Sequence, residues 1–201
     1  MQKYLIEGED ALLMLNRMVT RDLNKLRDNR VTYVAWCTDS GRLIDDGTVF
    51  RLGENRYLLT CGSPCLAWLR KSAFGFTNVE VTDATEDWAA LSLQGPTSFA
   101  VLQRMGLDGV AALKPFDIGH FPFLGGTLMV SRTGFTGDLG YELWIDPELA
   151  LPFWDALYAA GADSVWQSAT MGGELRPELQ GEVFEDANTA PAANKQDVLA
   201  C

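Results

Sequence analysis

The stretch VTYVAWCTDSGRLIDDGTVFRLGENRYLLTC (residues 31–61) decides the fold that the sequence predicts. Its β-branched and aromatic residues are typical of strands, and they form three runs, at 31–38, 42–52 and 56–61. The turn sequences DSG (39–41) and GEN (53–55) separate these runs. Because short turns join strands that run in opposite directions, we expect an antiparallel meander of three strands.

The flanking sequence adds helices and strands without regular alternation. Helical spacing of apolar residues predicts helices at about 10–18, 64–73, 97–105 and 147–160. Alternating or β-branched runs predict strands near 4–7, 78–82, 87–93, 118–123, 126–132 and 141–145. Because short turns join most of the strands, we expect an α+β fold of mostly antiparallel sheet with flanking helices.

A second segment, GTLMVSRTGFTGDLGYELWI (residues 126–145), carries three glycines between two strand-like runs, at positions 134, 137 and 140. Its GxxGxxG spacing and the strand that follows exclude the dinucleotide-binding fingerprint, which is GxGxxG between a strand and a helix. Glycine adopts positive φ at little cost and lets a flat ligand lie against the backbone. The segment is therefore either the polar edge of a binding pocket or an ordinary glycine-rich β-hairpin.

The pair Asp45-Asp46 is unusual because side chains alternate across a strand, which puts the two carboxylates on opposite faces. Both faces carry apolar neighbours, so we expect at least one carboxylate to be partly buried, as at many functional sites. Four aromatic side chains nearby would suit a flat heterocycle with N–H donors, namely Tyr33, Trp36, Phe50 and Tyr57. Two alternatives stay open: the carboxylates cap a turn or pair with Arg42 or Arg51, and the aromatics pack in the core.

Composition narrows the classes of function. The 201 residues include 16 Lys or Arg against 27 Asp or Glu, and the formal charge of −11 argues against binding nucleic acid or an anionic membrane. No apolar run approaches the length of a membrane span, and the N-terminus lacks the basic and apolar regions of a signal peptide. We therefore expect a cytoplasmic protein with no nucleic-acid or membrane partner.

Metal-ligating residue types are sparse. Of the four cysteines, Cys61 and Cys65 have CxxxC spacing, which is neither a zinc knuckle nor a CxxC redox motif, and we expect mostly buried thiols. His120 is the single histidine of the sequence, which excludes a histidine-rich metal centre. Its alternating surroundings favour an ordinary strand residue over a catalytic one, and we expect no metal site.

The composition changes near residue 162. Residues 171–201 contain several acidic residues, and Phe184 is their only aromatic. Residues 187–196 are small and polar, which is typical of weakly ordered chain. We expect one domain over residues 1–162 and a weakly ordered tail over 163–201.

Three segments together resemble the aminomethyltransferase family, whose type member is the T-protein of the glycine cleavage system. They are SGRLIDDGTVFRLGENRYLL (40–59), LSLQGPTSFAVL (91–102) and SRTGFTGDLGYEL (131–143), in the family's order and at its spacing, within a match over residues 1–161. The family includes folate-dependent demethylases and folate-binding proteins without methyl transfer. The resemblance implies a folate-binding domain with tetrahydrofolate as its cofactor.

The resemblance also implies roles for five residues. Asp46 matches the family's essential aspartate, and Tyr33, thirteen residues earlier, matches a folate-contacting tyrosine. Glu142 matches the pterin-binding glutamate, while Phe135 stands where the family has a tyrosine and Thr48 where it has a hydrophobic residue. Asp46 is therefore the expected catalytic residue, and the other four are expected to bind the cofactor.

The activity that the resemblance implies is transfer of a methyl or aminomethyl group from a small-molecule donor to tetrahydrofolate. A lipoyl carrier protein would be the partner of a T-protein-like enzyme. The sequence begins after the family's usual N-terminal segment and lacks its C-terminal domain, so we expect a fragment with reduced or no activity alone. The alternatives are a non-catalytic folate-binding module, whose KGCYxGQE-like motif is missing here, and a non-functional fragment.

Overall fold

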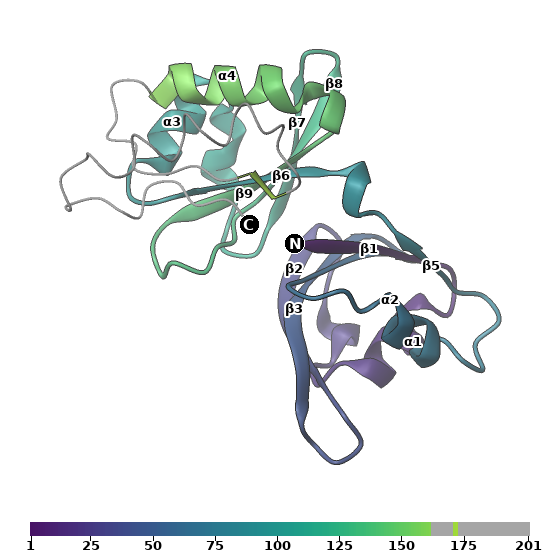
Figure 1. Cartoon of the computed structure of the whole chain (residues 1–201). Helices are drawn as coiled ribbons and strands as arrows, with labels where there is room; N and C mark the ends of the chain where they lie inside the picture. The colour runs from purple at the N-terminus through teal and green to yellow at the C-terminus, as the bar shows by residue number, and fades with distance from the viewer. Residues whose placement is uncertain (162–170, 173–201) are drawn as a thin grey trace. The chain divides into compact units, whose positions relative to one another are not determined.

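Two compact units make up the computed structural model of the chain, which describes residues 1–161 and 171–172. Unit 1 is Met1–Thr85 and unit 2 is Glu86–Cys201. Each unit has a five-stranded sheet (Figure 1). Each also has its own hydrophobic core. The paired strands are antiparallel in both sheets, and helices flank them, which confirms the expected α+β fold.

Unit 1 contains the predicted meander. Its strand order is β2-β3-β4-β1-β5, formed by β1 (Gln2–Glu7), β2 (Arg30–Cys37), β3 (Leu43–Gly53), β4 (Arg56–Cys61) and β5 (Glu80–Asp83). The neighbours β2, β3 and β4 are the three predicted strands, so that prediction is confirmed. The unit also has helices α1 (Ala11–Met18) and α2 (Leu66–Ser72) and the 3-10 turn η1 (Leu23–Lys25).

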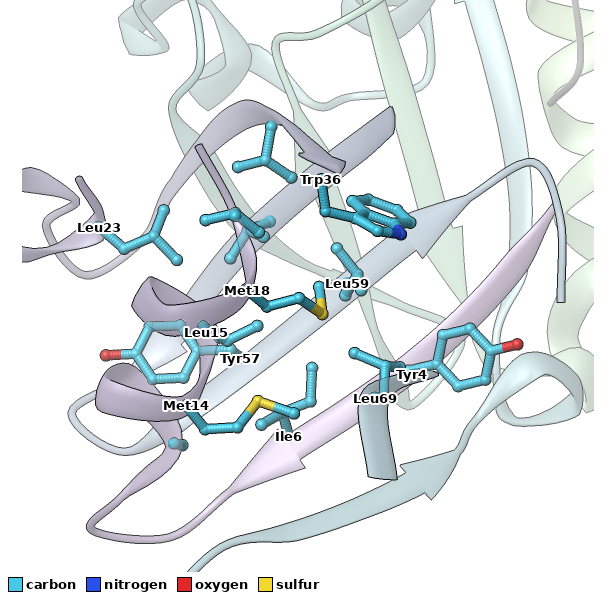
Figure 2. Packing of buried hydrophobic residues seen from close by; sticks show 14 of the residues in the cluster. Tyr4, Ile6, Met14, Leu15, Met18, Leu23, Trp36, Tyr57, Leu59 and Leu69 are labelled. Atoms are coloured by element: carbon cyan, nitrogen blue, oxygen red, sulfur yellow. The ribbon is translucent and has the colours of Figure 1, made fainter. Parts of the chain in front are cut away.

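One face of this sheet is covered by the two helices. Met14 and Leu15 of α1 and Leu69 of α2 belong to one buried cluster with Trp36 and Tyr57 of the strands (Figure 2). All five side chains are fully buried. Burial of large apolar side chains is the main favourable term in folding, at roughly 1.5–3 kcal/mol for each. Because this cluster fills the sheet face toward α1 and α2, a binding site in unit 1 would lie on the opposite face.

Unit 2 is organised around a central buried strand. Its strand order is β10-β6-β9-β8-β7, formed by β6 (Ala89–Gln94), β7 (Ile118–Phe123), β8 (Gly126–Ser131), β9 (Gly140–Ile145) and β10 (Met171–Gly172). All six residues of β9 are buried. The helical elements are α3 (Ser98–Arg104), α4 (Ala150–Gly161) and the 3-10 turns η3 (Asp108–Ala112) and η4 (Pro147–Leu149). The 3-10 turn η2 (Thr85–Asp87) begins at the last residue of unit 1.

The core of unit 2 lies between its sheet and the helices α3 and α4 (Figure 1). Leu102 of α3 and Phe153 of α4 belong to the same buried cluster as Leu143 of β9. The helix predicted over 147–160 divides into η4 and α4. At the start of η4, the Asp146 side chain accepts a 2.8 Å hydrogen bond from the backbone N of Glu148.

The predicted weakly ordered tail, 163–201, lies outside the described residues except for Met171–Gly172, which pair with β6. Within the described part of the chain, every helix is too short or too polar to cross a membrane.

Candidate functional site

The sheet face of unit 1 that points away from α1 and α2 carries the predicted residues Tyr33, Asp46 and Thr48, since strand side chains alternate. Tyr33 on β2 is opposite Thr48 on β3, which is opposite Thr60 on β4. Oγ1 of Thr48 lies 2.6 Å from Oγ1 of Thr60. Lys3 on β1 is opposite Thr60 and is fully buried. Four strands therefore contribute to one polar row across this face.

Asp46 lies beside this polar row and is exposed. The Tyr33 hydroxyl donates a hydrogen bond of 2.7 Å to Oδ2 of Asp46, and Tyr33 is itself 51% exposed. This bond to a carboxylate raises the pKa of the Tyr33 phenol, because ionisation would place a phenolate against a second anion. The structure thus brings two predicted residues into direct contact and leaves the carboxylate open to solvent.

Asp45 has a different environment. It is half-buried, so the expectation that at least one of the two carboxylates is partly buried is confirmed. Its Oδ1 accepts a 2.9 Å hydrogen bond from the backbone N of Asp46, and its Oδ2 accepts one of 3.2 Å from the backbone N of Ser63. The turn-capping alternative therefore describes Asp45. Of the two arginines considered as partners, Arg51 pairs with Asp28 instead, at 2.6 Å.

The expected aromatic surroundings of Asp46 are only partly present. Trp36 and Tyr57 belong to the core beneath α1 and α2, so for them the core-packing alternative is correct. Tyr33 and Trp36 are three residues apart on one strand, and an odd separation places them on opposite faces. Among the four aromatics, Tyr33 is the one whose contact with Asp46 is a hydrogen bond.

Gly47 fits the backbone of β4 closely. A Cβ atom at this position would lie 1.9 Å from the carbonyl oxygen of Thr60, well inside van der Waals contact. Gly47 is paired with Cys61 across the two strands. The glycine that follows the aspartate pair is therefore required by the close approach of β4 to β3.

Glu142 lies in unit 2, on the face of β9 that points away from α3 and α4. It is 9% exposed, opposite Ser92 on β6 and Ser131 on β8. Its Oε2 accepts hydrogen bonds from the hydroxyls of Ser131, at 3.4 Å, and Thr133. Burial raises the pKa of Glu142, and these two hydroxyl donors offset part of that rise.

The loop between β8 and β9, residues 132–139, holds Phe135, which is 70% exposed. Its conformation depends on Gln94, which is fully buried at the end of β6. Nε2 of Gln94 lies 3.2 Å from the carbonyl oxygen of Thr133 and 3.3 Å from that of Tyr141, so it bridges the two ends of the loop. The hydroxyl of Thr136 donates to its Oε1 at 3.4 Å.

Two of the three glycines in this segment, one in the loop and one at the start of β9, are explained by the same glutamine. A Cβ at Gly134 or at Gly140 would lie 2.0 Å or 1.8 Å from Oε1 of Gln94. Gly137 has a φ of +83°, which only glycine adopts at little cost. The three glycines thus allow close packing on Gln94 at two positions and a left-handed turn at the third.

The sequence interpretation missed Gln94, Ser131 and Thr133. A signal for Gln94 was present, because the alternation in LSLQ puts Ser92 and Gln94 on one face and two leucines on the other. Ser131 and Thr133 are likewise two residues apart and both face Glu142.

A hollow of about 480 Å³ lies elsewhere in unit 2, beside Trp88, Gly125 and Leu149, and none of the predicted site residues lines it. Residues 1–161 and 171–172 contain no group of three or more His, Cys, Asp or Glu side chains that could hold a metal ion.

The order of these elements and the residues they carry correspond to a known protein family. The model of the GCVT N-terminal domain matches residues 1–178 of the chain. The chain belongs to the aminomethyltransferase family. An aminomethyltransferase from Shouchella clausii is 39% identical over 166 residues, which are 80% of this chain and 45% of that protein. One from Halothermothrix orenii is 35% identical over 167 residues, which are 81% of this chain and 46% of that protein.

A solved aminomethyltransferase has a similar fold. The crystal structure of the glycine cleavage system aminomethyltransferase T from Bartonella henselae matches with a TM-score of 0.69 and 27% identity, over 78% of this chain and 43% of that one. The chain therefore spans somewhat less than half the length of the aminomethyltransferases that it matches. Of the five predicted site residues, Tyr33, Asp46 and Thr48 share one face of unit 1, and Phe135 and Glu142 belong to the β8–β9 region of unit 2.

Proposed function

We propose that residues 1–162 form a tetrahydrofolate-dependent one-carbon transferase domain, with Asp46 as catalytic residue and Tyr33, Thr48, Phe135 and Glu142 as cofactor-binding residues. The donor is a small molecule with a methyl or an aminomethyl group, and a lipoyl carrier protein is the partner if the group is aminomethyl. A cytoplasmic location belongs to the proposal. Membership of the aminomethyltransferase family supports it.

The observation that carries the proposal is the contact between Tyr33 and Asp46. These two residues match separate site positions of the family, and their side chains are joined by a hydrogen bond of 2.7 Å. An exposed carboxylate that is held by one hydroxyl keeps its remaining acceptor sites for a ligand. Asp46 can therefore orient the amine of a donor and hold its proton during transfer.

The residues of unit 2 suit a flat ligand with N–H donors. The Glu142 carboxylate is buried, so its ionised form is disfavoured until further donors reach it. Charge-assisted N–H bonds from a pterin ring would supply such donors. The exposed ring of Phe135 offers an apolar surface to the same kind of ligand. When it is bound, tetrahydrofolate supplies the N5 nitrogen that accepts the one-carbon group.

Calorimetric titration with 5-formyltetrahydrofolate, a stable relative of the cofactor, tests the binding part of the proposal. Glu142→Gln should weaken binding about ten- to hundredfold, since a hydrogen bond to a charged group is worth about 1.5–3 kcal/mol. Glu148→Gln is the matched control, because Glu148 is exposed on η4 and should bind like the parent. The ligand is raised to millimolar concentration, so that weak binding by this length of chain is still measured.

Transfer to tetrahydrofolate is then measured for the parent and for Asp46→Asn. The proposal expects Asp46→Asn to retain binding and to lose transfer. Equal affinities for the parent and Glu142→Gln would remove Glu142 from the site. Binding by the parent without transfer from any methyl or aminomethyl donor would favour the alternative of a non-catalytic folate-binding module.

A further inference from the structure

Two thiols lie close together at one end of the unit 1 sheet. Cys61 is the last residue of β4 and Cys65 directly precedes α2, and their sulfur atoms are 3.5 Å apart. Both are free cysteines, 3% and 7% exposed. The three residues between them, 62–64, are exposed. A buried dithiol is thus covered by a short surface segment.

This segment is linked to the proposed catalytic residue through Asp45. Sγ of Cys61 donates to the carbonyl oxygen of Ser63 at 3.2 Å, while the backbone N of Ser63 donates to Oδ2 of Asp45 at 3.2 Å. The other carboxylate oxygen, Oδ1, accepts the backbone N of Asp46 at 2.9 Å. One carboxylate therefore connects the dithiol segment to the backbone of Asp46.

The two thiols have unequal environments. Contact with the Cys65 sulfur, together with burial, raises the pKa of Cys61. The same contact, aided by the Tyr4 hydroxyl, lowers the pKa of Cys65. A thiol with a lowered pKa has more of the reactive thiolate form. Cys65 is accordingly the nucleophile of the pair, and Cys61 is the thiol that completes a disulfide.

We propose that Cys61 and Cys65 form a reversible thiol–disulfide pair that is oxidised by hydroperoxides. Oxidation breaks the hydrogen bonds that the Asp45 carboxylate accepts from the backbone N of Ser63 and of Asp46. The consequence for one-carbon transfer rests on the proposed function of Asp46. The breaking of the hydrogen bonds rests on the contacts within unit 1.

The chemistry balances with a hydroperoxide as the two-electron oxidant. The Cys65 thiolate attacks one peroxide oxygen, the O–O bond breaks, and the leaving oxygen takes up a proton, so Cys65 becomes a sulfenic acid. The Cys61 sulfur then attacks the Cys65 sulfur, the S–O bond breaks, and the sulfenic oxygen leaves as water. Two thiols and one hydrogen peroxide yield one disulfide and two waters.

Closure of the disulfide must move the covering segment. A disulfide needs about 2.05 Å between sulfurs, so the atoms that are 3.5 Å apart must approach by about 1.5 Å. The Cys61 thiol also loses the proton that it donates to Ser63. Gly62, which has open space around it, lets the segment adapt. The Ser63 amide then leaves Asp45. The Asp45 carboxylate, no longer held by Ser63, turns away from the Asp46 amide, which loses its hydrogen bond.

The test uses the full chain with Cys37→Ser and Cys201→Ser, so that Cys61 and Cys65 are the two cysteines that remain. After treatment with hydrogen peroxide, intact mass should fall by two hydrogens and both free thiols should disappear, and dithiothreitol should restore them. Amide hydrogen exchange at Ser63 and Asp46 should become about tenfold faster in the oxidised chain, as expected for a lost hydrogen bond. Cys65→Ser should show no peroxide-dependent change in exchange.

Two results would overturn the proposal. One is a pair that stays reduced in the folded chain under conditions that oxidise the urea-unfolded chain. The other is a disulfide that forms without a change in exchange at Ser63 and Asp46. Titration of the reduced and oxidised chains with 5-formyltetrahydrofolate separates this inference from the proposed function. A reduced chain that does not bind this ligand would contradict the proposed function. The hydrogen-exchange measurement would still test whether disulfide formation breaks the hydrogen bonds of Asp45.

Discussion

The hydroxyl of Tyr33 on β2 donates a 2.7 Å hydrogen bond to the carboxylate of Asp46 on β3, although the two residues are not cross-strand partners. Tyr33 is paired with Thr48, and Asp46 is paired with Ala35. The contact is therefore diagonal, which a side chain as long as tyrosine can span. It restrains an exposed carboxylate without burying it.

The Tyr33 phenol should report on this contact. Its hydrogen bond to Asp46 raises its pKa, so Asp46→Asn should bring the pKa of Tyr33 down toward the ordinary value of about 10. Tyrosine labelled at Cζ resolves the individual phenols by NMR during a pH titration, and Tyr33→Phe assigns the signal. A Tyr33 titration that is the same in the parent and in Asp46→Asn would contradict the contact.

The two aspartates should separate function from stability. Asp46→Asn keeps the shape of an exposed side chain and removes its charge, so we expect lost transfer and an unchanged melting temperature. Asp45→Asn replaces one of two acceptor oxygens by an NH₂ group and so removes one hydrogen bond. We therefore expect a lower melting temperature, with a loss of about 0.5–1.5 kcal/mol in the free energy of unfolding. Thermal unfolding and the transfer assay on both variants check this. A lower melting temperature for Asp46→Asn alone would reverse the assignment.

Glu142 should make stability depend on pH. Because its folded-state pKa is raised by burial, the folded chain binds more protons than the unfolded chain between about pH 4.3 and the raised value. Its contribution to the free energy of unfolding is therefore lost as the pH rises through that window.

Urea unfolding from about pH 4 to about pH 8 checks the sign for this residue, with Glu142→Gln as the comparison. The stability of the variant relative to the parent should increase as the pH rises, since the glutamine does not titrate. A difference that is constant over this range would show that Glu142 is not buried as described.

Gln94 should hold the β8–β9 loop. Gln94→Met keeps the length of the side chain and removes its donors, which leaves the carbonyl oxygens of Thr133 and Tyr141 without this partner. The expected loss is about 1–3 kcal/mol of unfolding free energy, with faster amide exchange in residues 132–139. Gln103→Met on the exposed side of α3 is the control. Equal losses at the two glutamines would contradict the bridging role of Gln94.

Gly47 should tolerate no side chain. Gly47→Ala places a Cβ against the carbonyl oxygen of Thr60, and such overpacking costs about 1–3 kcal/mol. Gly53→Ala in the same strand is the control, since its Cβ would be 4.0 Å from the nearest atom. Urea unfolding of both variants measures the loss in the free energy of unfolding. A loss for Gly53→Ala as large as that for Gly47→Ala would contradict the steric explanation.

The meander of unit 1 could be predicted because its information is local. The strands β2, β3 and β4 and the two turns between them are all contained in residues 30–61. The central position of β9 could not be predicted, because its pairing with β6 joins residues 140–145 to residues 89–94 across a long stretch of chain. No turn sequence specifies such a pairing.

In the candidate site, the sheet face of each residue could be predicted from the sequence, but its hydrogen-bond partners could not. The alternation rule separated Asp45 from Asp46, but whether a carboxylate caps a turn depends on Ser63, which reaches Asp45 only after β3 and β4 pair. The alternation rule also applies to Tyr33 and Trp36. Their separation of three residues places them on opposite faces of the sheet, so they could not both lie beside Asp46. The alternation in LSLQ marks the face on which Gln94 lies, but its role in holding the β8–β9 loop needed the folded structure, because the carbonyl partners follow it by 39 and 47 residues.

The close approach at Gly47 also restricts how this sequence can change over evolutionary time. A side chain at position 47 would enter the space that the carbonyl oxygen of Thr60 occupies. A single exchange at position 47 would therefore be selected against unless the backbone at Thr60 also moved. Because the contact is with a backbone atom, an exchange of the side chain at position 60 does not relieve it, so position 47 should stay glycine among descendants of this gene while position 60 varies.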